Sequence, residues 1–116
     1  MKKILIIDDE ERILEIYIRT FVEAGFIVRR AKNAWEATNI LIREDMDLVL
    51  LDIRMPNING KTIFEIIQEY NPNIKVIVFS VYPINVQKQM VPLAKDFYDK
   101  SEGPLNLLEK VTNALV

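Results

Sequence analysis

The stretch DLVLLDIRMPNING, residues 47–60, decides the fold of this chain. Its apolar run, residues 48–51, is typical of a strand that is buried on both faces of a sheet. The run ends in Asp52, and the proline and glycine that follow mark a loop before a helical pattern. We therefore expect Asp52 at the carboxyl end of a central strand, the edge of an open α/β sheet at which ligands bind. Taken alone, an aspartate at this point is equally typical of the start of a turn.

Four further segments have the pattern of strands. They are residues 4–7, 26–31, 75–79 and 96–99, and the second is mixed enough in polarity to lie near an edge of the sheet. A helical pattern follows each strand, and strands that alternate with helices are typical of a parallel sheet covered on both faces. Because right-handed crossovers leave few topologies, we expect a flavodoxin-like, doubly wound α/β fold of (βα)5 type, with strand order 2-1-3-4-5.

The helix boundaries are indicated by their capping residues. Gly25 is expected to end the first helix, and Asn33 with Glu36 forms a variant of the capping box at the start of the second. Pro92 limits a short fourth helix that begins near Asn85. We also expect Tyr17 and Trp35 to pack on the sheet. Each of the four longer helices has an apolar stripe that we expect to face the core. In chain order, the stripes are Leu14, Tyr17, Ile18, Phe21 and Val22; Ala34, Ala37, Ile40 and Leu41; Ile63, Ile66, Ile67 and Tyr70; and Leu105, Leu108, Val111 and Leu115.

The composition excludes several classes of function. The chain has 116 residues, which is the size of one domain. It contains no cysteine and no histidine, which excludes disulfides, thiol chemistry, histidine-based catalytic triads and zinc–histidine sites. The 15 basic and 17 acidic residues give a net charge of -2, so we expect no direct binding to nucleic acid or to an anionic membrane.

Two features favour a cytoplasmic protein. No apolar run approaches the length that is needed to span a bilayer. The apolar stretch near the N-terminus stops at Ile7, which is too short for the core of a signal peptide, and acidic residues follow it.

Polar residues end four of the five expected strands. Asp8 and Asp9 follow the first strand, Asp52 the third, Ser80 the fourth and Lys100 the fifth. Because the carboxyl ends of parallel strands share one edge, we expect these side chains to converge at the point where the strand order reverses. This grouping is far more specific than any one of its motifs.

The grouped residue types suggest phosphoryl transfer onto a carboxylate. Three carboxylates that lie together repel one another, and a divalent cation relieves that repulsion. The ligands are hard oxygens, so Mg²⁺ is the expected ion and Mn²⁺ a substitute. Lys100 supplies a point charge that suits phosphate, and Ser80 supplies a hydroxyl donor. An acidic nucleophile, a metal, a lysine and a hydroxyl fit phosphoryl transfer.

The whole chain, residues 1–116, resembles the receiver domain of two-component response regulators. The motifs that carry the resemblance are Asp8-Asp9, Asp52-Ile-Arg-Met-Pro56 with Gly60, Ser80 and Lys100. It implies that Asp52 becomes a 4-aspartylphosphate by taking a phosphoryl group from a phosphohistidine of a sensor histidine kinase or phosphotransfer protein. The residues that it implies hold Mg²⁺ are Asp8, Asp9, Asp52 and, through its backbone carbonyl, Arg54. It further implies that Ser80 and Lys100 bind the phosphoryl oxygens.

The resemblance also implies a switch. Phosphorylation draws Ser80 toward the new oxygens, and Phe97, three residues before the lysine, swings inward. The surface that responds is formed by the fourth helix, the fifth strand and the last helix. An aromatic residue on a strand is also typical of simple packing. The expected partners are an unknown downstream protein and a second copy of the chain after phosphorylation. The domain takes part in phosphoryl transfer and self-dephosphorylation without being a turnover enzyme.

Several residues depart from the family pattern. Ser101 stands where a proline, often in a cis bond, usually follows the lysine. A cis bond before a non-proline residue costs about 3 kcal/mol, and the sequence leaves open whether the bond after Lys100 is cis or trans. Val81 stands where a small residue is usual, and we expect it to hinder the swing of Phe97. Arg54 and Tyr82 are bulky, and we expect them to shield the phosphorylated site and slow its hydrolysis.

Alternative functions remain at this stage. An atypical receiver would act mainly as a docking or dimerisation module, with weak switching. A phosphatase with an aspartyl-phosphate intermediate would need a second acid where Arg54 stands. A flavodoxin-like flavin protein would need a phosphate-binding loop rich in serine, threonine and glycine after the first strand, and no such loop follows it. The sequence leaves open whether this is a stand-alone receiver or part of a longer regulator, and which kinase, pathway and output partner it serves.

Overall fold

The computed structural model describes residues 1–54 and 59–116. Its strands and helices alternate along the chain as the sequence predicts. In order they are β1 (Lys3–Ile7), α1 (Glu11–Glu23), β2 (Ile27–Ala31), α2 (Ala34–Arg43), β3 (Leu48–Leu51), α3 (Gly60–Tyr70), β4 (Lys75–Ser80), α4 (Ile84–Met90), β5 (Asp96–Asp99), the 3-10 turn η1 (Lys100–Glu102) and α5 (Pro104–Ala114).

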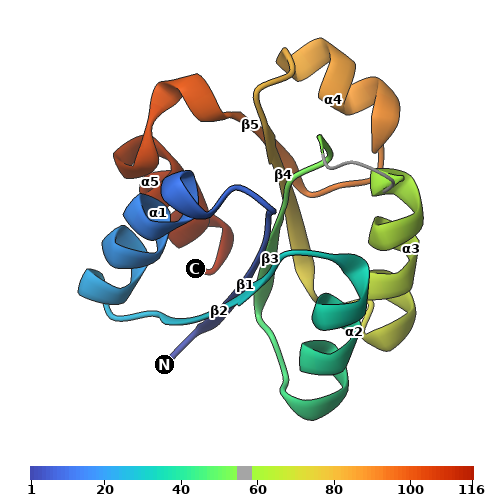
Figure 1. The fold of residues 1–116 in the computed structure, drawn as a ribbon, viewed down its shortest axis with the longest axis horizontal. Helices are drawn as coiled ribbons and strands as arrows, with labels where there is room; N and C mark the ends of the chain where they lie inside the picture. The colour runs from blue at the N-terminus through green and yellow to red at the C-terminus, as the bar shows by residue number, and fades with distance from the viewer. Residues whose placement is uncertain (55–58) are drawn as a thin grey trace.

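The strands form one parallel sheet in the order β2-β1-β3-β4-β5. This confirms the flavodoxin-like topology, in which β1 and β3 are neighbours at the point where the order reverses. Figure 1 shows α1 and α5 on one face of the sheet and α2, α3 and α4 on the other. The central strands β1 and β3 are therefore covered on both faces, which is why their sequences are continuously apolar.

The core consists of two clusters, one on each face of the sheet. Side chains of α1 and α5, including Phe21 and Leu107, pack on one face against alternate residues of the central strands. Side chains of α3, including Ile63 and Ile67, pack on the other. Adjacent strand residues thus enter different clusters, as the two-residue period of a strand requires.

The expected apolar stripes needed correction in α1, α3 and α5. Phe64 and Leu107 are buried although the stripes did not include them. A helix turns about 100° per residue and presents only a limited arc to the core. Residues at the edge of that arc stay in solvent, and the expected core residues that are exposed are Val22, Tyr70 and Leu105.

The prediction that Trp35 packs on the sheet was wrong. Its side chain is 76% exposed. Trp35 lies two residues, or about 200° around the helix, from the buried Ala37, so the two point in opposite directions. Tyr17, in contrast, is buried as expected.

The capping residues act as predicted. The side chain of Asn33 accepts a hydrogen bond of 2.8 Å from the backbone N–H of Glu36 and so begins α2. Gly25 follows α1 with a φ of 95°, a conformation that favours glycine. Within residues 1–54 and 59–116, no helix is long and apolar enough to cross a membrane.

Candidate functional site

The strand register brings two of the predicted acids side by side. The N–H of Asp8 donates to the carbonyl of Ala31 at 2.9 Å, and the N–H of Asp52 donates to the carbonyl of Ile7 at the same distance. The sheet ladder therefore continues one residue beyond β1 and β3 before the chain turns away. Asp8 and Asp52 are both buried at this edge, although their side chains are ionisable.

Lys100 closes the group from the end of β5. Its Nζ lies 2.6 Å from Oδ2 of Asp8 and 3.1 Å from Oδ2 of Asp52. Only 6% of the Lys100 side chain is exposed. Burial acts to lower the pKa of Lys100, but its hydrogen bond with Asp8 and the charge of Asp52 outweigh burial and raise it. The lysine is therefore held as a cation between two carboxylates.

The environment of Asp52 favours its protonated form. Burial raises its pKa to about 6, and the nearby charge of Asp8 acts in the same direction. Lys100 and a 2.9 Å hydrogen bond from the backbone N–H of Arg54 oppose the rise. The carboxylate that exists above this pH is poorly solvated, and a poorly solvated anion gains most from a new cation or a new bond.

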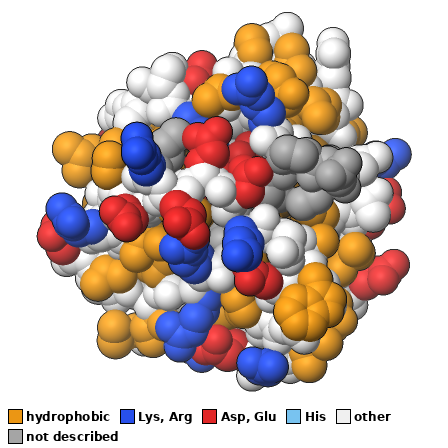
Figure 2. All heavy atoms as spheres, in the orientation of Figure 1, with side chains coloured by type: hydrophobic (Ala, Val, Ile, Leu, Met, Phe, Trp, Pro, Cys, Tyr) orange, Lys and Arg blue, Asp and Glu red, His pale blue; other side chains and the backbone are white. Residues whose placement is uncertain are grey.

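Three carboxylates form a group that can hold a divalent cation. Asp8, Asp9 and Asp52 each offer an oxygen, and these oxygens lie within 4.8 Å of one another. Figure 2 shows acidic side chains gathered near the middle of this face of the molecule. Asp9 is exposed, which leaves an open side for waters. An all-oxygen set of this kind fits Mg²⁺, which keeps several waters when it binds proteins. We refer to Asp8, Asp9, Asp52 and Lys100 as the strand-end cluster.

The two residues expected to tune the site contact each other. The guanidinium carbon of Arg54 lies 6.0 Å from the centroid of the Tyr82 ring. Ser80, at the end of β4, is fully buried, and its Oγ accepts a hydrogen bond of 3.2 Å from the N–H of Tyr82. The metal-ligand role of the Arg54 carbonyl stays a prediction. Met55 and Pro56 of the motif lie outside the described residues.

The proposed switch residue lies on the α3 and α4 side of the sheet. Phe97 is half-buried and packs, as Tyr82 does, against the buried cluster that includes Val91. Val81 is 47% exposed and lines a groove on the α1 side together with Ile16. The two side chains therefore lie on different sides of the sheet, and the packing gives no support to the expected hindrance by Val81.

The peptide bond after Lys100, which the sequence left open, is trans. Among the residues that the structure describes, no peptide bond is cis. The chain forms the turn η1, in which the side chain of Asp99 accepts a hydrogen bond of 2.9 Å from the N–H of Ser101. Gly103 then has a φ of 83° and Pro104 begins α5.

Gly60 has a steric reason to be glycine. It begins α3, and a Cβ placed on it would lie 2.5 Å from Cγ2 of Ile53. Since Ile53 directly follows Asp52, a side chain at Gly60 would push α3 away from the segment that carries the acid. The glycine of the motif thus supports the site through packing.

Gln87 is a buried polar residue that the sequence analysis missed. Its Nε2 donates to the backbone carbonyls of Tyr82 at 2.8 Å, Tyr98 at 2.9 Å and Ser80 at 3.4 Å. Its Oε1 is the one buried side-chain oxygen or nitrogen without a partner in the part of the chain that is described. Gln87 thereby connects α4 to the ends of β4 and β5. No local pattern identifies it, because a glutamine on a short helix is ordinarily a surface residue.

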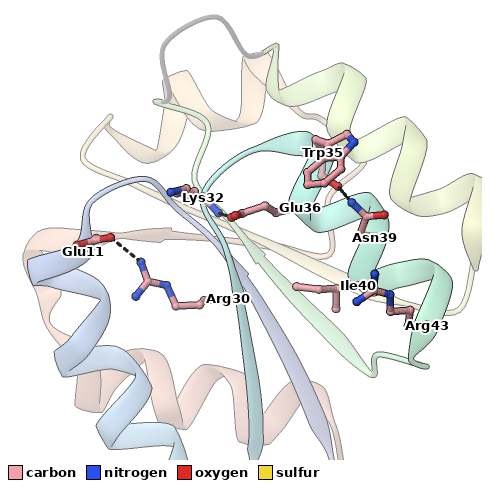
Figure 3. A pocket seen from close by; sticks show the side chains of 8 residues that line it. All are labelled: Glu11, Arg30, Lys32, Trp35, Glu36, Asn39, Ile40 and Arg43. Carbon is pink, nitrogen blue, oxygen red and sulfur yellow. Dashed lines mark hydrogen bonds and ion pairs between the residues drawn. The ribbon is translucent and has the colours of Figure 1, made fainter.

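A second groove lies apart from the strand-end cluster. It runs beside β2 and α2, and Figure 3 shows Arg30 directed toward Glu11 and Trp35 on the outer side of α2. Arg30 and Glu11 form an ion pair of 3.3 Å, so part of the charge of this edge groove is compensated within the groove. The strand-end cluster, with its buried charges, remains the candidate site.

Two known proteins are similar to this chain over two thirds or more of its length. The chain is 35% identical over 81 residues to sporulation initiation phosphotransferase F of Bacillus subtilis, a match that covers 70% of this chain and 65% of the relative. It is 31% identical over 78 residues to the transcriptional regulatory protein CusR of Escherichia coli, which covers 67% of this chain and 34% of CusR. The matched stretch thus spans about a third of CusR and under two thirds of the phosphotransferase.

Solved structures of response regulators have the same fold as this chain. The response regulator TrrA of Thermotoga maritima, in complex with Mg²⁺ and BeF, superposes with a TM-score of 0.86 at 32% identity, over 97% of this chain and 98% of TrrA. TrrA in complex with the histidine kinase ThkA gives a TM-score of 0.88 at 32% identity, over 100% of this chain and 100% of the matched chain. The sequence-family model of the response regulator receiver domain matches residues 4–112 of this chain. With the strand order and the grouped acids described above, this match shows that the chain belongs to the response regulator receiver domain family.

Proposed function

We propose that Asp52 is the phosphoacceptor of this receiver domain. The observation that carries the proposal is the burial of the Asp52 carboxylate between Lys100 and the two other acids. An anion in that position is reactive because little solvent stabilises it, and the lysine lies 3.1 Å from one of its oxygens. The same lysine can follow the negative charge onto the oxygens of an incoming phosphoryl group.

The proposed step moves one phosphoryl group. A carboxylate oxygen of Asp52 attacks the phosphorus of a phosphohistidine, a P–O bond forms and the P–N bond breaks. The imidazole leaves with the bonding electron pair and takes a proton from solvent. The attacking oxygen must be deprotonated, and the pKa of Asp52, about 6, leaves it mostly ionised at neutral pH. Lys100 and Ser80 bind the phosphoryl oxygens in this scheme.

The acids of the strand-end cluster would hold the metal. Asp8, Asp9, Asp52 and the backbone carbonyl of Arg54 are the proposed ligands, Mg²⁺ is the proposed ion and Mn²⁺ a substitute. When bound, Mg²⁺ supplies positive charge that offsets the charge of the phosphoryl oxygens. Backbone N–H groups orient the two buried carboxylates, because Glu10 donates to Asp8 at 3.0 Å and Arg54 donates to Asp52.

The proposed donor is a histidine of a sensor kinase or a phosphotransfer protein, met in the cytoplasm. The chain contains no histidine, so the donor must come from another protein. TrrA, which is similar to this chain, is known in complex with a histidine kinase. An apolar groove of about 550 Å³ adjoins Lys100 and includes Ile16, Val81 and Pro104. We assign this groove to the partner kinase, because Lys100, the residue proposed to bind the phosphoryl oxygens, lines it.

The proposed output is a change of the surface formed by α4, β5 and α5. Ser80 would turn toward the phosphoryl oxygens and Phe97 would repack in response. Gln87 supports this coupling, because its amide bonds the carbonyls of Ser80 and Tyr98 from α4. A movement of Ser80 would therefore be transmitted through Gln87 to both α4 and β5. The downstream protein, or a second copy of the chain, would bind the altered surface.

Arg54 and Tyr82 are proposed to slow hydrolysis of the phosphorylated form. Arg54 stands two residues after Asp52 and Tyr82 two residues after Ser80, and their 6.0 Å contact brings the two bulky side chains together, so that both could act against an attacking water. The doubly substituted Arg54→Ala, Tyr82→Ala variant should lose its phosphoryl group faster than the natural chain, as followed by intact mass over time. Equal rates of phosphoryl loss in the variant and in the natural chain would contradict this role for both residues.

The phosphoacceptor proposal is tested by intact-mass analysis after incubation with acetyl phosphate and Mg²⁺. We expect one added phosphoryl group, none without Mg²⁺ and none in Asp52→Asn. Asp47→Asn is the matched control, because Asp47 precedes the same strand at its opposite end and bonds the N–H of Lys3. That control should be phosphorylated like the natural chain.

Failure of this test would favour the alternative function. A chain that binds Mg²⁺ but takes up no phosphoryl group would be an atypical receiver that acts by docking or dimerisation. A chain that is phosphorylated without any change in its association or in its α4, β5 and α5 surface would also favour that alternative.

A further inference from the structure

We propose that Tyr17 and Phe79 are positioning residues for Lys100, and we call this pair the aromatic support. The inference rests on the proposed role of Lys100 at the phosphoacceptor site. Neither residue touches the strand-end acids through a hydrogen bond, and both lie in the cluster beneath α1 and α5. Together they hold the lysine at its ammonium group and at its backbone.

Phe79 holds the ammonium group. The Nζ of Lys100 lies 4.6 Å from the centroid of the Phe79 ring, which is fully buried near the end of β4. The face of an aromatic ring is negative and attracts a cation at this distance, most strongly where water is excluded. Asp8 and Asp52 contact the same nitrogen. The ring therefore supplies a further contact that fixes the direction in which the ammonium points.

Tyr17 holds both the ring and the backbone. Its own ring packs edge-to-face on Phe79, with centroids 5.7 Å apart and an interplanar angle of 84°. Its hydroxyl donates to the backbone carbonyl of Lys100 at 3.3 Å. One residue of α1 thus braces the ring under the ammonium and also fixes the chain from which the lysine extends.

The turn that carries Lys100 does not by itself restrict the lysine side chain. The lysine is followed by Ser101, which is exposed, and by Gly103 in a left-handed conformation. The side chain of Asp99 bonds the N–H of Ser101, but this contact lies within the turn itself. A lysine side chain has four rotatable bonds and loses considerable entropy when it is held in one geometry. Contacts from α1 and β4 restrict it in a way that the turn alone does not.

The first test observes Lys100 directly by NMR and needs no phosphorylation. Because the ammonium lies over a ring, the signals of the adjacent Lys100 ε-methylene should be displaced from those of the exposed lysines. Phe79→Met keeps an apolar side chain of similar size but removes the ring, and it should return these signals to the ordinary lysine position. Ile77→Met is the matched control, since Ile77 is buried in the same cluster two residues earlier on β4. Unchanged Lys100 signals in Phe79→Met would overturn the inference.

The second test measures the rate of phosphorylation by acetyl phosphate. We expect Phe79→Met to be about fivefold slower than the natural chain, as loss of a buried cation–π contact implies. Tyr17→Phe, which removes one hydrogen bond, should be about threefold slower. Ile77→Met should keep the natural rate. In a Lys100→Met background, Phe79→Met should slow the residual reaction no further. An equal slowing in both backgrounds would mean that Phe79 acts only through general packing, and the inference would fail.

The two tests separate this inference from the proposed function. If the Lys100 signals respond to Phe79→Met but no chain is phosphorylated, the aromatic support stands and the phosphoacceptor proposal fails. If the chain is phosphorylated on Asp52 but Phe79→Met changes neither the signals nor the rate, only the aromatic support fails.

Discussion

Two regions of this molecule hold ion pairs in opposite environments. In the strand-end cluster, Lys100 contacts Asp8 and Asp52, and the three side chains are 6%, 0% and 3% exposed. Beside the edge groove, Arg30 contacts Glu11, and these side chains are 40% and 70% exposed. The pairing chemistry is the same, and the difference lies in the solvent.

The difference teaches which of these pairs can do chemistry. Water screens the exposed pair, so its charges gain little from each other and lose little when separated. The buried charges have lost their hydration, and each depends on its partners. A buried group in which one lysine faces two carboxylates keeps an excess of negative charge, so it will take up a divalent cation readily. The following predictions test this comparison, from the largest expected effect to the smallest.

Removal of the buried lysine should have the largest effect. Lys100→Ala leaves the Asp8 and Asp52 carboxylates buried without their cation, and we expect a loss of about 3 kcal/mol in the free energy of unfolding. Urea unfolding near pH 7.5 without divalent cations measures it. Lys110→Ala is the control, because Lys110 makes a 3.0 Å pair with Asp96 at 32% and 44% exposure. Equal losses in the two variants would contradict the comparison.

Removal of the buried charge of Asp52 should stabilise the chain. The pKa of Asp52 is about 6 in the folded state, above its ordinary value. At a pH between these two values, the folded state therefore binds more protons than the unfolded state. The free energy of unfolding therefore falls through this window as the pH rises. Asp52→Asn cannot ionise, and we expect it to exceed the natural chain by about 2 kcal/mol near neutral pH and to match it near pH 4.

The control for this prediction is an exposed acid. Asp45→Asn alters a carboxylate at the surface and should change stability little at either pH. Urea unfolding at both pH values gives the comparison. A natural chain more stable than Asp52→Asn near neutral pH without Mg²⁺ would show that Lys100 compensates the buried charge in full.

Loss of the buried amide should cost less than loss of the buried cation. Gln87→Leu removes the hydrogen bonds to the carbonyls of Ser80, Tyr82 and Tyr98, and we expect a loss of about 1–2 kcal/mol. Gln89→Leu, at an exposed position of the same helix, is the matched control. Thermal unfolding of both variants compares them. If Gln87→Leu is as stable as the control, the amide does not hold α4 to the sheet.

Loss of the exposed pair should have the smallest effect. Arg30→Ala should leave the midpoint of urea unfolding unchanged within error, and added salt should reduce any residual difference. A clear destabilisation would show that exposure is a poor guide to the strength of the pairs in this molecule.

The sequence predicted those features that depend on neighbours along the chain. The apolar runs of β1 and β3 identified buried strands, and the polar residues after them identified the edge where Asp8, Asp52 and Lys100 meet. The strand order followed, because few topologies satisfy right-handed crossovers. The expected stripes were wrong where periodicity misplaced the buried face of a helix: Leu105 was expected in the core but is exposed, and Leu107, two residues later, is fully buried.

The tertiary structure decided the features that depend on distance through space. Burial raises the pKa of Asp52, Tyr17 reaches the carbonyl of a residue 83 positions later, and Gln87 bonds two strands from a short helix. None of these contacts leaves a local pattern, because the partners are far apart in sequence and similar side chains at other positions only fill the core. The sequence by itself therefore determined which chemical groups meet at the sheet edge. The packing of α1, β4 and α4 around that edge determined how firmly they are held and how strongly they are charged, because both properties depend on the exclusion of water.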